Sequence, residues 1–260
     1  GYTFASILIL GAAIGANVAV YSVVRAVLLA DLPVRDPESL VWIWSTRVDR
    51  DKAFFSIPNL FDYQSQTQTL QEMAAFGNWS ASVTGQGEAE RLTGVRVTGN
   101  MFPMLGTRPV IGRALDARDG APGAERTVVL SRSLWQRRFG SDRGLIGRTL
   151  LLDGEPHTVV GILAPDFLVP NTRAEIAAAL DLGSHPRRSE RGSNFLRALG
   201  RVRPGVTLTQ VGVEMDAITQ RLKADFPEDN GRHSKPRVVS LRDEITGAYR
   251  KPLWMLFGAV

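Results

Sequence analysis

The first 24 residues of the chain form an apolar stretch, and Arg25 is the first charged residue. As an α-helix, residues 4–24 would be about 32 Å long, which matches a hydrocarbon core of roughly 30 Å. Gly11 and Gly15 form a small-xxx-small step that lets a second helix pack closely in lipid, and Asn17 can hydrogen-bond across such a contact. The pattern predicts a first transmembrane helix and its exit within residues 1–30.

A cleaved signal peptide and a buried core helix are the alternatives for this stretch. A signal peptide has a basic start and an apolar centre of about 7–15 residues. This run is longer and has no basic start, and its three glycines and lack of a polar face fit a core helix less well.

A second apolar run, PLWMLFGAV, follows Lys251 and extends to the last residue. This run is too short to span a bilayer, so residues 251–260 are interpreted as the start of a second transmembrane helix. Because the chain begins with Gly1 and the run stops at Val260, we expect further sequence beyond both ends.

Strand and helix patterns alternate between the two apolar runs, and the first strand–helix–strand unit begins with a strand at residues 40–44. Ser56 is placed to cap the following helix, with Pro58 in its first turn, where proline is tolerated. This helix is expected to end near Leu70. Strands follow at residues 73–76 and 91–97.

The second strand–helix–strand unit begins with a strand at residues 195–202 and a turn at Pro204-Gly205. Thr207 and Gln210 have the spacing of a capping box that opens a helix. A strand is predicted after it at residues 236–241. Along the helix, apolar residues recur every three or four positions, as in a core-facing stripe: Leu208, Val211, Met215, Ile218, Leu222 and Phe226.

The middle of the chain is richer in strands. A short strand at residues 128–130 precedes a helix that Ser131 caps and that extends to Phe139. Residues 149–162 are predicted to form two strands around a turn at residues 153–156.

These patterns predict an α+β fold. Residues 31–112 and 192–250 are assigned to a membrane-proximal α+β lobe that contains the two strand–helix–strand units. Residues 113–191 are assigned to an inserted strand-rich lobe, and transmembrane helices flank the whole.

Composition and charge narrow the class of protein. Hydrophobic residues make up 44% and charged residues 22% of the chain, which excludes a disordered tail, a collagen-like rod and a pure membrane bundle. The absence of cysteine excludes disulfides, thiolate metal sites and a cysteine nucleophile. The net charge is +5, but the arginines are spread singly, so we expect no nucleic-acid partner.

The search for catalytic or cofactor motifs yields no site residue: we expect no catalytic, cofactor-binding or metal-ligating residue and no cofactor. His157, His185 and His233 lie far apart in the sequence, and none has the spacing of a metal motif. There is no Gly-x-Ser-x-Gly elbow and no P-loop; Gly85-Gln86-Gly87 lacks a third glycine and a following helix. Asp116, Asp119 and Gly120 have the wrong spacing for a calcium loop.

Several long blocks occur together in an order that resembles a known family. They include GANVAVYSVVRAVLLADLPVRDPESLV, SIPNLFDYQSQTQTLQEMAAF, ERLTGVRVTGNMFPMLGTRPVIGRAL, VVLSRSLWQRRFGSDRGLIGRTLLLDGEPHTVVGILAPDF and RALGRVRPGVTLTQVGVEMDAITQRLKADFP. The chain resembles the MacB-type (MacB/FtsX-like) periplasmic core domain of ABC transporter permeases, and most closely the acidobacterial duplicated orphan permeases. Two places depart from the family pattern: Asp31 replaces a proline, and residues 175–180 lack a tryptophan and a proline.

The resemblance implies the two-lobed fold and a non-catalytic domain. It also implies partners: the bacterial inner membrane, a separate cytoplasmic ATP-binding subunit that hydrolyses ATP, a second permease copy in a dimer, and a periplasmic adaptor. The main domain is then expected in the periplasm, where it takes part in export or mechanical work.

Two other functions compete with this interpretation. One is a membrane-anchored or secreted extracytoplasmic module that binds a ligand without transport. The other is an extracellular hydrolase, for which no nucleophile, metal cluster or acid–base pair is evident. If the chain is part of a permease, the cleft between the two lobes is the expected place of partner or substrate contact.

Overall fold

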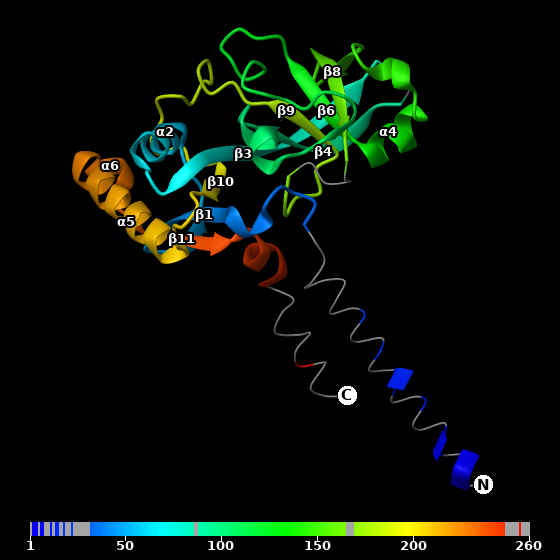
Figure 1. Ribbon diagram of the computed structural model, residues 1–260. Helices are drawn as coiled ribbons and strands as arrows, with labels where there is room; N and C mark the ends of the chain where they lie inside the picture. Colours follow the sequence, from blue (N-terminus) through cyan, green and yellow to red (C-terminus); the bar gives the residue numbers. More distant parts are fainter. Residues whose placement is uncertain are drawn as a thin grey trace. The chain divides into compact units, whose positions relative to one another are not determined.

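The computed structural model describes residues 32–85, 88–164 and 169–247, together with residues 2–4, 6, 7, 11, 14, 15, 18, 22 and 255. The chain divides into two compact units (Figure 1). One consists of Gly1–Leu32 and Leu241–Val260, and the other is Pro33–Ser240.

In the first unit, the described positions before residue 32 are helical, as are residues 241–247. Most of the two predicted transmembrane segments, at residues 1–30 and 251–260, lies outside the described residues, as does Asp31. Within the part of the chain that is described, no helix is both long enough and apolar enough to cross a membrane.

The second unit is built on one mixed sheet of 11 strands, in the order β11-β1-β10-β3-β4-β9-β6-β8-β5, with β2 beside β1 and β7 beside β3 and β8. Most neighbours are antiparallel, but β4–β9 and β6–β8 are parallel. The strands are β1 (Leu40–Arg47), β2 (Arg50–Ala53), β3 (Leu70–Thr84), β4 (Glu90–Val97), β5 (Pro109–Gly112), β6 (Thr127–Ser131), β7 (Thr149–Leu152), β8 (Glu155–Leu163), β9 (Ile176–Ala179), β10 (Arg197–Val202) and β11 (His233–Ser240).

This unit has five α-helices and two 3-10 turns among its described residues. They are α2 (Ile57–Gln66), α3 (Met101–Leu105), α4 (Arg132–Phe139), α5 (Leu208–Asp225) and α6 (Pro227–Asn230), with the 3-10 turns η1 (Pro37–Ser39) and η2 (Arg143–Leu145). This mixed fold of one large sheet and several helices agrees with the predicted class.

The predicted cap of α2 is confirmed, because the Ser56 side chain accepts a hydrogen bond from the Asn59 amide. Its predicted end is wrong: α2 stops at Gln66, and Leu70 already begins β3. The reason is a distant carboxylate. Glu214 on α5 accepts hydrogen bonds from residues 67–69, at 2.7 Å from Thr67 Oγ1, 2.8 Å from the Gln68 amide and 3.1 Å from the Thr69 amide, which fixes the chain reversal there.

The strand predicted at residues 73–76 is part of the much longer β3, which has 15 residues. β3 pairs with β10 over its first half, with β4 over its second half and with β7 at its end. It therefore extends along both halves of the sheet (Figure 1).

The second predicted unit is largely confirmed. Thr207 and Gln210 form the complete capping box of α5, and β10 and β11 stand close to the predicted strands, although β11 begins earlier, at His233. The middle of the predicted stripe is buried. Its two ends are not, since the exposed fractions of Leu208 and Phe226 are 41% and 38%.

In the middle of the chain, β6, α4 and its Ser131 cap are confirmed. β7 and β8 are joined by Asp153 and Gly154, both with positive φ (54° and 80°), the two-residue turn that an Asp-Gly pair favours. The block at residues 175–180, which departs from the family pattern, forms β9, a strand that the sequence analysis missed. β9 lies between β4 and β6 in the sheet.

Two hydrophobic clusters of buried residues lie on this sheet. One joins α2 and α5 to β1, β10 and the first half of β3, with Ile43, Leu60 and Met215 among its members. The other joins α4 to β4, β6, β8 and β9 and includes Leu134 and Leu130. The predicted lobe boundaries, residues 31–112 and 192–250 against 113–191, stay a prediction.

Candidate functional site

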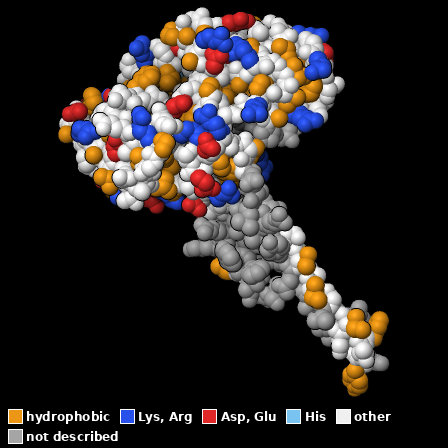
Figure 2. All heavy atoms as spheres, in the orientation of Figure 1, with side chains coloured by type: hydrophobic (Ala, Val, Ile, Leu, Met, Phe, Trp, Pro, Cys, Tyr) orange, Lys and Arg blue, Asp and Glu red, His pale blue; other side chains and the backbone are white. Residues whose placement is uncertain are grey.

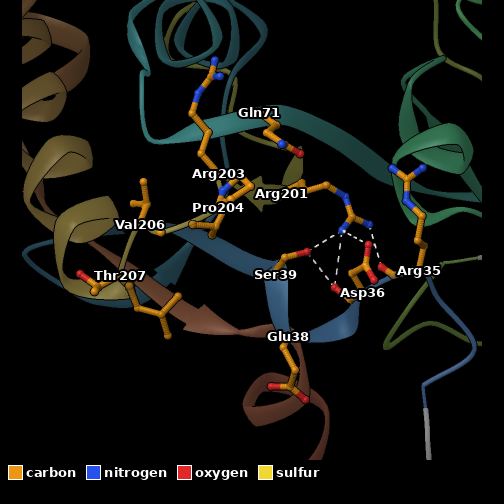
Figure 3. A pocket seen from close by; sticks show the side chains of 13 residues that line it. Arg35, Asp36, Glu38, Ser39, Gln71, Arg201, Arg203, Pro204, Val206 and Thr207 are labelled. Carbon is orange, nitrogen blue, oxygen red and sulfur yellow. Dashed lines mark hydrogen bonds and ion pairs between the residues drawn. The ribbon is translucent and has the colours of Figure 1, made fainter.

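A pocket with a volume of about 840 Å³ lies where β1, β3 and β10 meet the N-terminus of α5 (Figure 3). Its walls come from the segment before β1, from Gln71 of β3, and from the connection between β10 and α5. The lining residues are Arg35, Asp36, Glu38, Ser39, Gln71, Arg201, Val202, Arg203, Pro204, Gly205, Val206, Thr207 and Leu208.

Arg201 is the buried cation of this pocket, with only 4% of its surface exposed. Its guanidinium donates to the carbonyl oxygens of Arg35 (2.7 Å) and Met104 (2.6 Å) and to the Ser39 hydroxyl. A longer contact of 3.5 Å reaches the Asp36 carbonyl oxygen. Hydrogen bonds from a charged donor in a buried place are the strong kind. We call this group, Arg201 with residues 35–39 and Met104, the Arg201 clamp.

Burial lowers the pKa of Arg201 from its ordinary value, with a further contribution from the nearby charge of Arg35. An arginine remains charged despite such a shift. The buried charge is therefore balanced mainly by carbonyl dipoles, since the Asp36 carboxylate lies 3.9 Å away and is mostly exposed.

The clamp also includes the end of α3. The Arg35 amide donates to the Leu105 carbonyl oxygen at 2.8 Å. Gly106 ends α3 with φ 69°, and a Cβ at this glycine would lie 2.5 Å from the Arg35 Cβ. Only glycine allows this close approach. The segment before β1 is thus held from two sides.

β1 begins directly after the clamp, and Val41 pairs with Ser240, the last residue of β11. The two ends of the second unit are therefore carried by neighbouring antiparallel strands at the same end of the sheet. The chain enters and leaves the unit at one place.

The opposite wall of the pocket is the start of α5. The Thr207 hydroxyl and the Gln210 side chain are bonded to each other and to each other's backbone amides, and so both are occupied in capping. The wall offers no serine or histidine beside them. The arrangement is suited to holding segments in place.

The structure places the three histidines as follows. His233 is buried in β11, where burial and the charges of Arg47 and Lys223 lower its pKa to about 4. His157 in β8 packs on Trp79, and His185 stacks on Phe195. Although they are distant in sequence, His157 and His185 line one polar pocket of about 510 Å³.

The two aspartates of the incomplete calcium motif are occupied by arginines. The hydrogen bond from Arg118 is the main cause that lowers the pKa of Asp116 to about 2. Burial alone would raise the pKa of Asp119, but hydrogen bonds from Arg113, the Asp116 amide and Thr127 outweigh it and lower the pKa. Among the described residues, no three acidic or histidine side chains converge to hold a metal ion.

The sequence analysis did not single out Arg201. The signal it missed is a charged side chain inside an otherwise apolar strand, RALGRV, where Arg197 and Arg201 share one face. A cation on a central strand needs a partner. Elsewhere the cations are scattered: on the face drawn in Figure 2, Lys and Arg are interleaved with Asp and Glu.

Comparison with known proteins adds a family and a fold. The family described as "MacB-like periplasmic core domain" matches residues 3–218. No curated protein matches the chain.

Three solved structures have a similar fold. A domain of a proposed permease from Porphyromonas gingivalis is 16% identical, with 81% of this chain and 92% of that chain covered and a TM-score of 0.60. The extracellular domain of the noncanonic ABC-type transporter YknZ from Gram-positive bacteria is 13% identical, with 77% of this chain and 99% of that chain covered and a TM-score of 0.57. The periplasmic region of MacB from Actinobacillus actinomycetemcomitans is 15% identical, with 82% of this chain and 92% of that chain covered and a TM-score of 0.58.

Proposed function

Since the chain belongs to the MacB-like periplasmic core domain family of ABC transporter permeases, we propose that it couples ATP hydrolysis by a separate cytoplasmic subunit to export or mechanical work across the inner membrane. In this proposal residues 1–30 and 251–260 belong to transmembrane helices, and the second unit lies in the periplasm. A dimeric permease and a periplasmic adaptor are the further partners. The domain itself does no chemistry.

The observation that carries the proposal is the pairing of Val41 with Ser240 beside the Arg201 clamp. A domain that responds to movement of two flanking helices needs both connections at one place and a rigid attachment at each. The β1–β11 ladder supplies one attachment, and the clamp fixes residues 35–39 to β10 and α3. Movement of either end then reaches the centre of the sheet through hydrogen bonds.

Topology is the first test. Ser184 is exposed, and these 260 residues contain no cysteine, so Ser184→Cys introduces the only thiol into this part of the protein. In the full-length protein, a membrane-impermeant maleimide is expected to label this thiol in intact spheroplasts. Val41→Cys is the matched control, because Val41 is buried and should react only after unfolding. Labelling of Ser184→Cys only after lysis would place the domain in the cytoplasm and overturn the proposal.

Coupling is the second test. The full-length permease and its ATP-binding subunit, purified together in nanodiscs, are compared as wild type, Arg201→Ala and Arg203→Ala. Arg203 lines the same pocket, but its side chain is exposed and outside the clamp. Loosening the clamp should reduce the permease-dependent part of ATP hydrolysis, whereas Arg203→Ala should leave it unchanged. Equal rates in all three would contradict coupling through the clamp, and a permease that binds ligand without any ATPase partner would favour the binding-module alternative.

A further inference from the structure

The polar pocket of about 510 Å³ lies in the other half of the sheet from the strands that pack on α5, where β4, β9, β6 and β8 meet two loops. Its strand residues include Arg96, Thr127, His157 and Ala178. The loops at residues 119–126 and 180–186 close its sides. Register explains the meeting: Arg96 pairs with Ala178, and Ala178 pairs with Val128, next to Thr127.

An aromatic platform holds the cation of this pocket in place. The guanidinium carbon of Arg96 lies 4.9 Å from the centre of the Trp79 ring. The centre of the His157 ring lies 5.8 Å from the same Trp79 ring centre. Trp79 is itself fixed, because its indole nitrogen donates to Asp153 Oδ2 at 2.8 Å. A cation over an aromatic face is attracted by the ring and keeps its donor edge free.

The other charged groups of the pocket already have partners. Asp119 accepts two hydrogen bonds from Arg113 (2.6 and 2.7 Å) and one from Thr127, and Arg126 pairs with Glu155 at 3.0 Å. Glu125 accepts from the Thr158 hydroxyl, and Asp181 accepts from the Ser184 amide at 2.9 Å.

Arg96 differs from these groups. Within the described residues its guanidinium has no hydrogen-bond or ion-pair partner; it lies over the Trp79 ring, near enough to Asp153 for its charge to help lower the pKa of that carboxyl. The pocket therefore presents an oriented, partly buried guanidinium whose five donors are unused.

The two histidines of the pocket lie near this charge. His157 Nδ1 lies 3.0 Å from the Glu155 carbonyl oxygen, which can only accept, so Nδ1 donates this hydrogen bond. Burial, with a contribution from Arg96, lowers the pKa of His157. Burial, Arg187 and Arg96 lower the pKa of His185, and Asp181 and Glu190 oppose this.

We propose that this pocket binds a small carboxylate ligand through the guanidinium of Arg96. The planar fork of a guanidinium matches a carboxylate with two parallel hydrogen bonds. One unpaired cation fits one negative charge, and a phosphate dianion would face Asp119, Glu125 and Asp181 as well. The proposal goes beyond the coupling function and holds whether or not the chain takes part in transport.

The carboxylate can come from a free organic acid or from the C-terminus of a peptide. Both are tested on the full-length chain in detergent micelles with 15N-labelled histidine. His157 and His185 report on the pocket, and His233, which does not line it, is the internal reference. The probes are butyrate, N-acetyl-Ala-Ala, its C-terminal amide and inorganic phosphate.

We expect saturable shifts of the His157 and His185 signals with at least one carboxylate, no shift of His233, and no response to the amide. A bound anion favours imidazolium, so affinity should rise as pH falls. Butyrate alone indicates an organic acid, and stronger binding of the peptide acid indicates a peptide C-terminus.

Arg96→Gln should weaken binding at least about tenfold, the loss expected for one charge-assisted pair. Arg91→Gln is the matched control, because Arg91 is exposed on the opposite face of the same strand. This variant should bind the carboxylate as tightly as the wild type. Arg96→Lys keeps the charge without the fork and should fall between them. The proposal is overturned if neither carboxylate shifts the two signals, or if the amide or phosphate binds as tightly as the carboxylates. It is also overturned if Arg91→Gln loses as much affinity as Arg96→Gln.

Discussion

Arg201 and Arg96 are two arginines on central strands of one sheet, and they differ in what surrounds them. Arg201 is buried and donates to three oxygens within 2.7 Å. Arg96 lies over Trp79 at a pocket with no acceptor bonded to it among the described residues. An arginine whose terminal NH groups are bonded within the protein stabilises the fold, whereas one whose donors are unused is available to a ligand.

The largest expected effect on stability comes from removing Arg201, the arginine whose side chain is bonded within the protein. Arg201→Ala leaves the buried Met104 carbonyl oxygen and the part-buried Arg35 carbonyl oxygen without their donor. The lost hydrogen bonds and the lost packing of the side chain should together lower the free energy of unfolding in urea by about 4 kcal/mol. Arg203→Ala should change it by less than about 0.5 kcal/mol. If the two variants lose equally, the clamp does not stabilise the fold.

The second effect is the acid dependence of stability that is due to His233, which is buried and, unlike His157 and His185, does not line the polar pocket. His233 has a pKa of about 4 in the folded chain, below its ordinary value of 6.5. The unfolded chain takes up this proton first, so stability is intact above about pH 6.5 and is lost as pH falls toward 4, by about 3 kcal/mol in all. His233→Leu should remove this part of the acid dependence of urea unfolding. An unchanged acid dependence in the variant would refute the assignment.

The third effect concerns a satisfied carboxylate. Burial raises the pKa of Glu214, but hydrogen bonds from Thr69, Thr67 and the backbone at residues 68 and 69 outweigh it, so the pKa is lowered. Its contribution is therefore present above the ordinary value of 4.5 and is lost as pH falls below it. Glu214→Gln should cost about 2 kcal/mol at neutral pH. Glu228→Gln, at an exposed site, is the control, and an equal cost there would remove the special role of Glu214.

The smallest expected effect on stability comes from removing Arg96, the arginine without a bonded acceptor among the described residues. Arg96→Gln removes one cation–π contact, which is worth about 0.5–1 kcal/mol, so thermal unfolding should be nearly unchanged. A loss as large as that of Arg201→Ala would mean that Arg96 also holds the fold together. Its unused donors would then not indicate a binding site.

Local signals were sufficient to predict several elements correctly. Ser131, the pair Thr207 and Gln210, and the turn at Asp153-Gly154 act through residues one to three positions away, so their patterns are visible in the sequence. The resemblance to the family agrees with the family model that matches residues 3–218.

What the sequence did not reveal depends on residues far apart in the chain. The end of α2 is set by Glu214, which is 145 to 147 positions away from residues 67–69. The Arg201 clamp joins residues separated by 97 to 166 positions. β9 was missed because its alanine-rich sequence has low strand propensity, and it forms through pairing with β4 and β6 on either side.

The pairing of Val41 with Ser240 decides how the second unit responds to force. Hydrogen bonds between antiparallel strands run across the strands. A pull that separates the two ends loads the β1–β11 bonds one after another from the Val41 end, as in opening a zipper, and meets little resistance. A pull that moves both ends together along the strands loads the β1–β10 bonds and the clamp at the same time, in shear. The unit is stiff in one direction and compliant in the other.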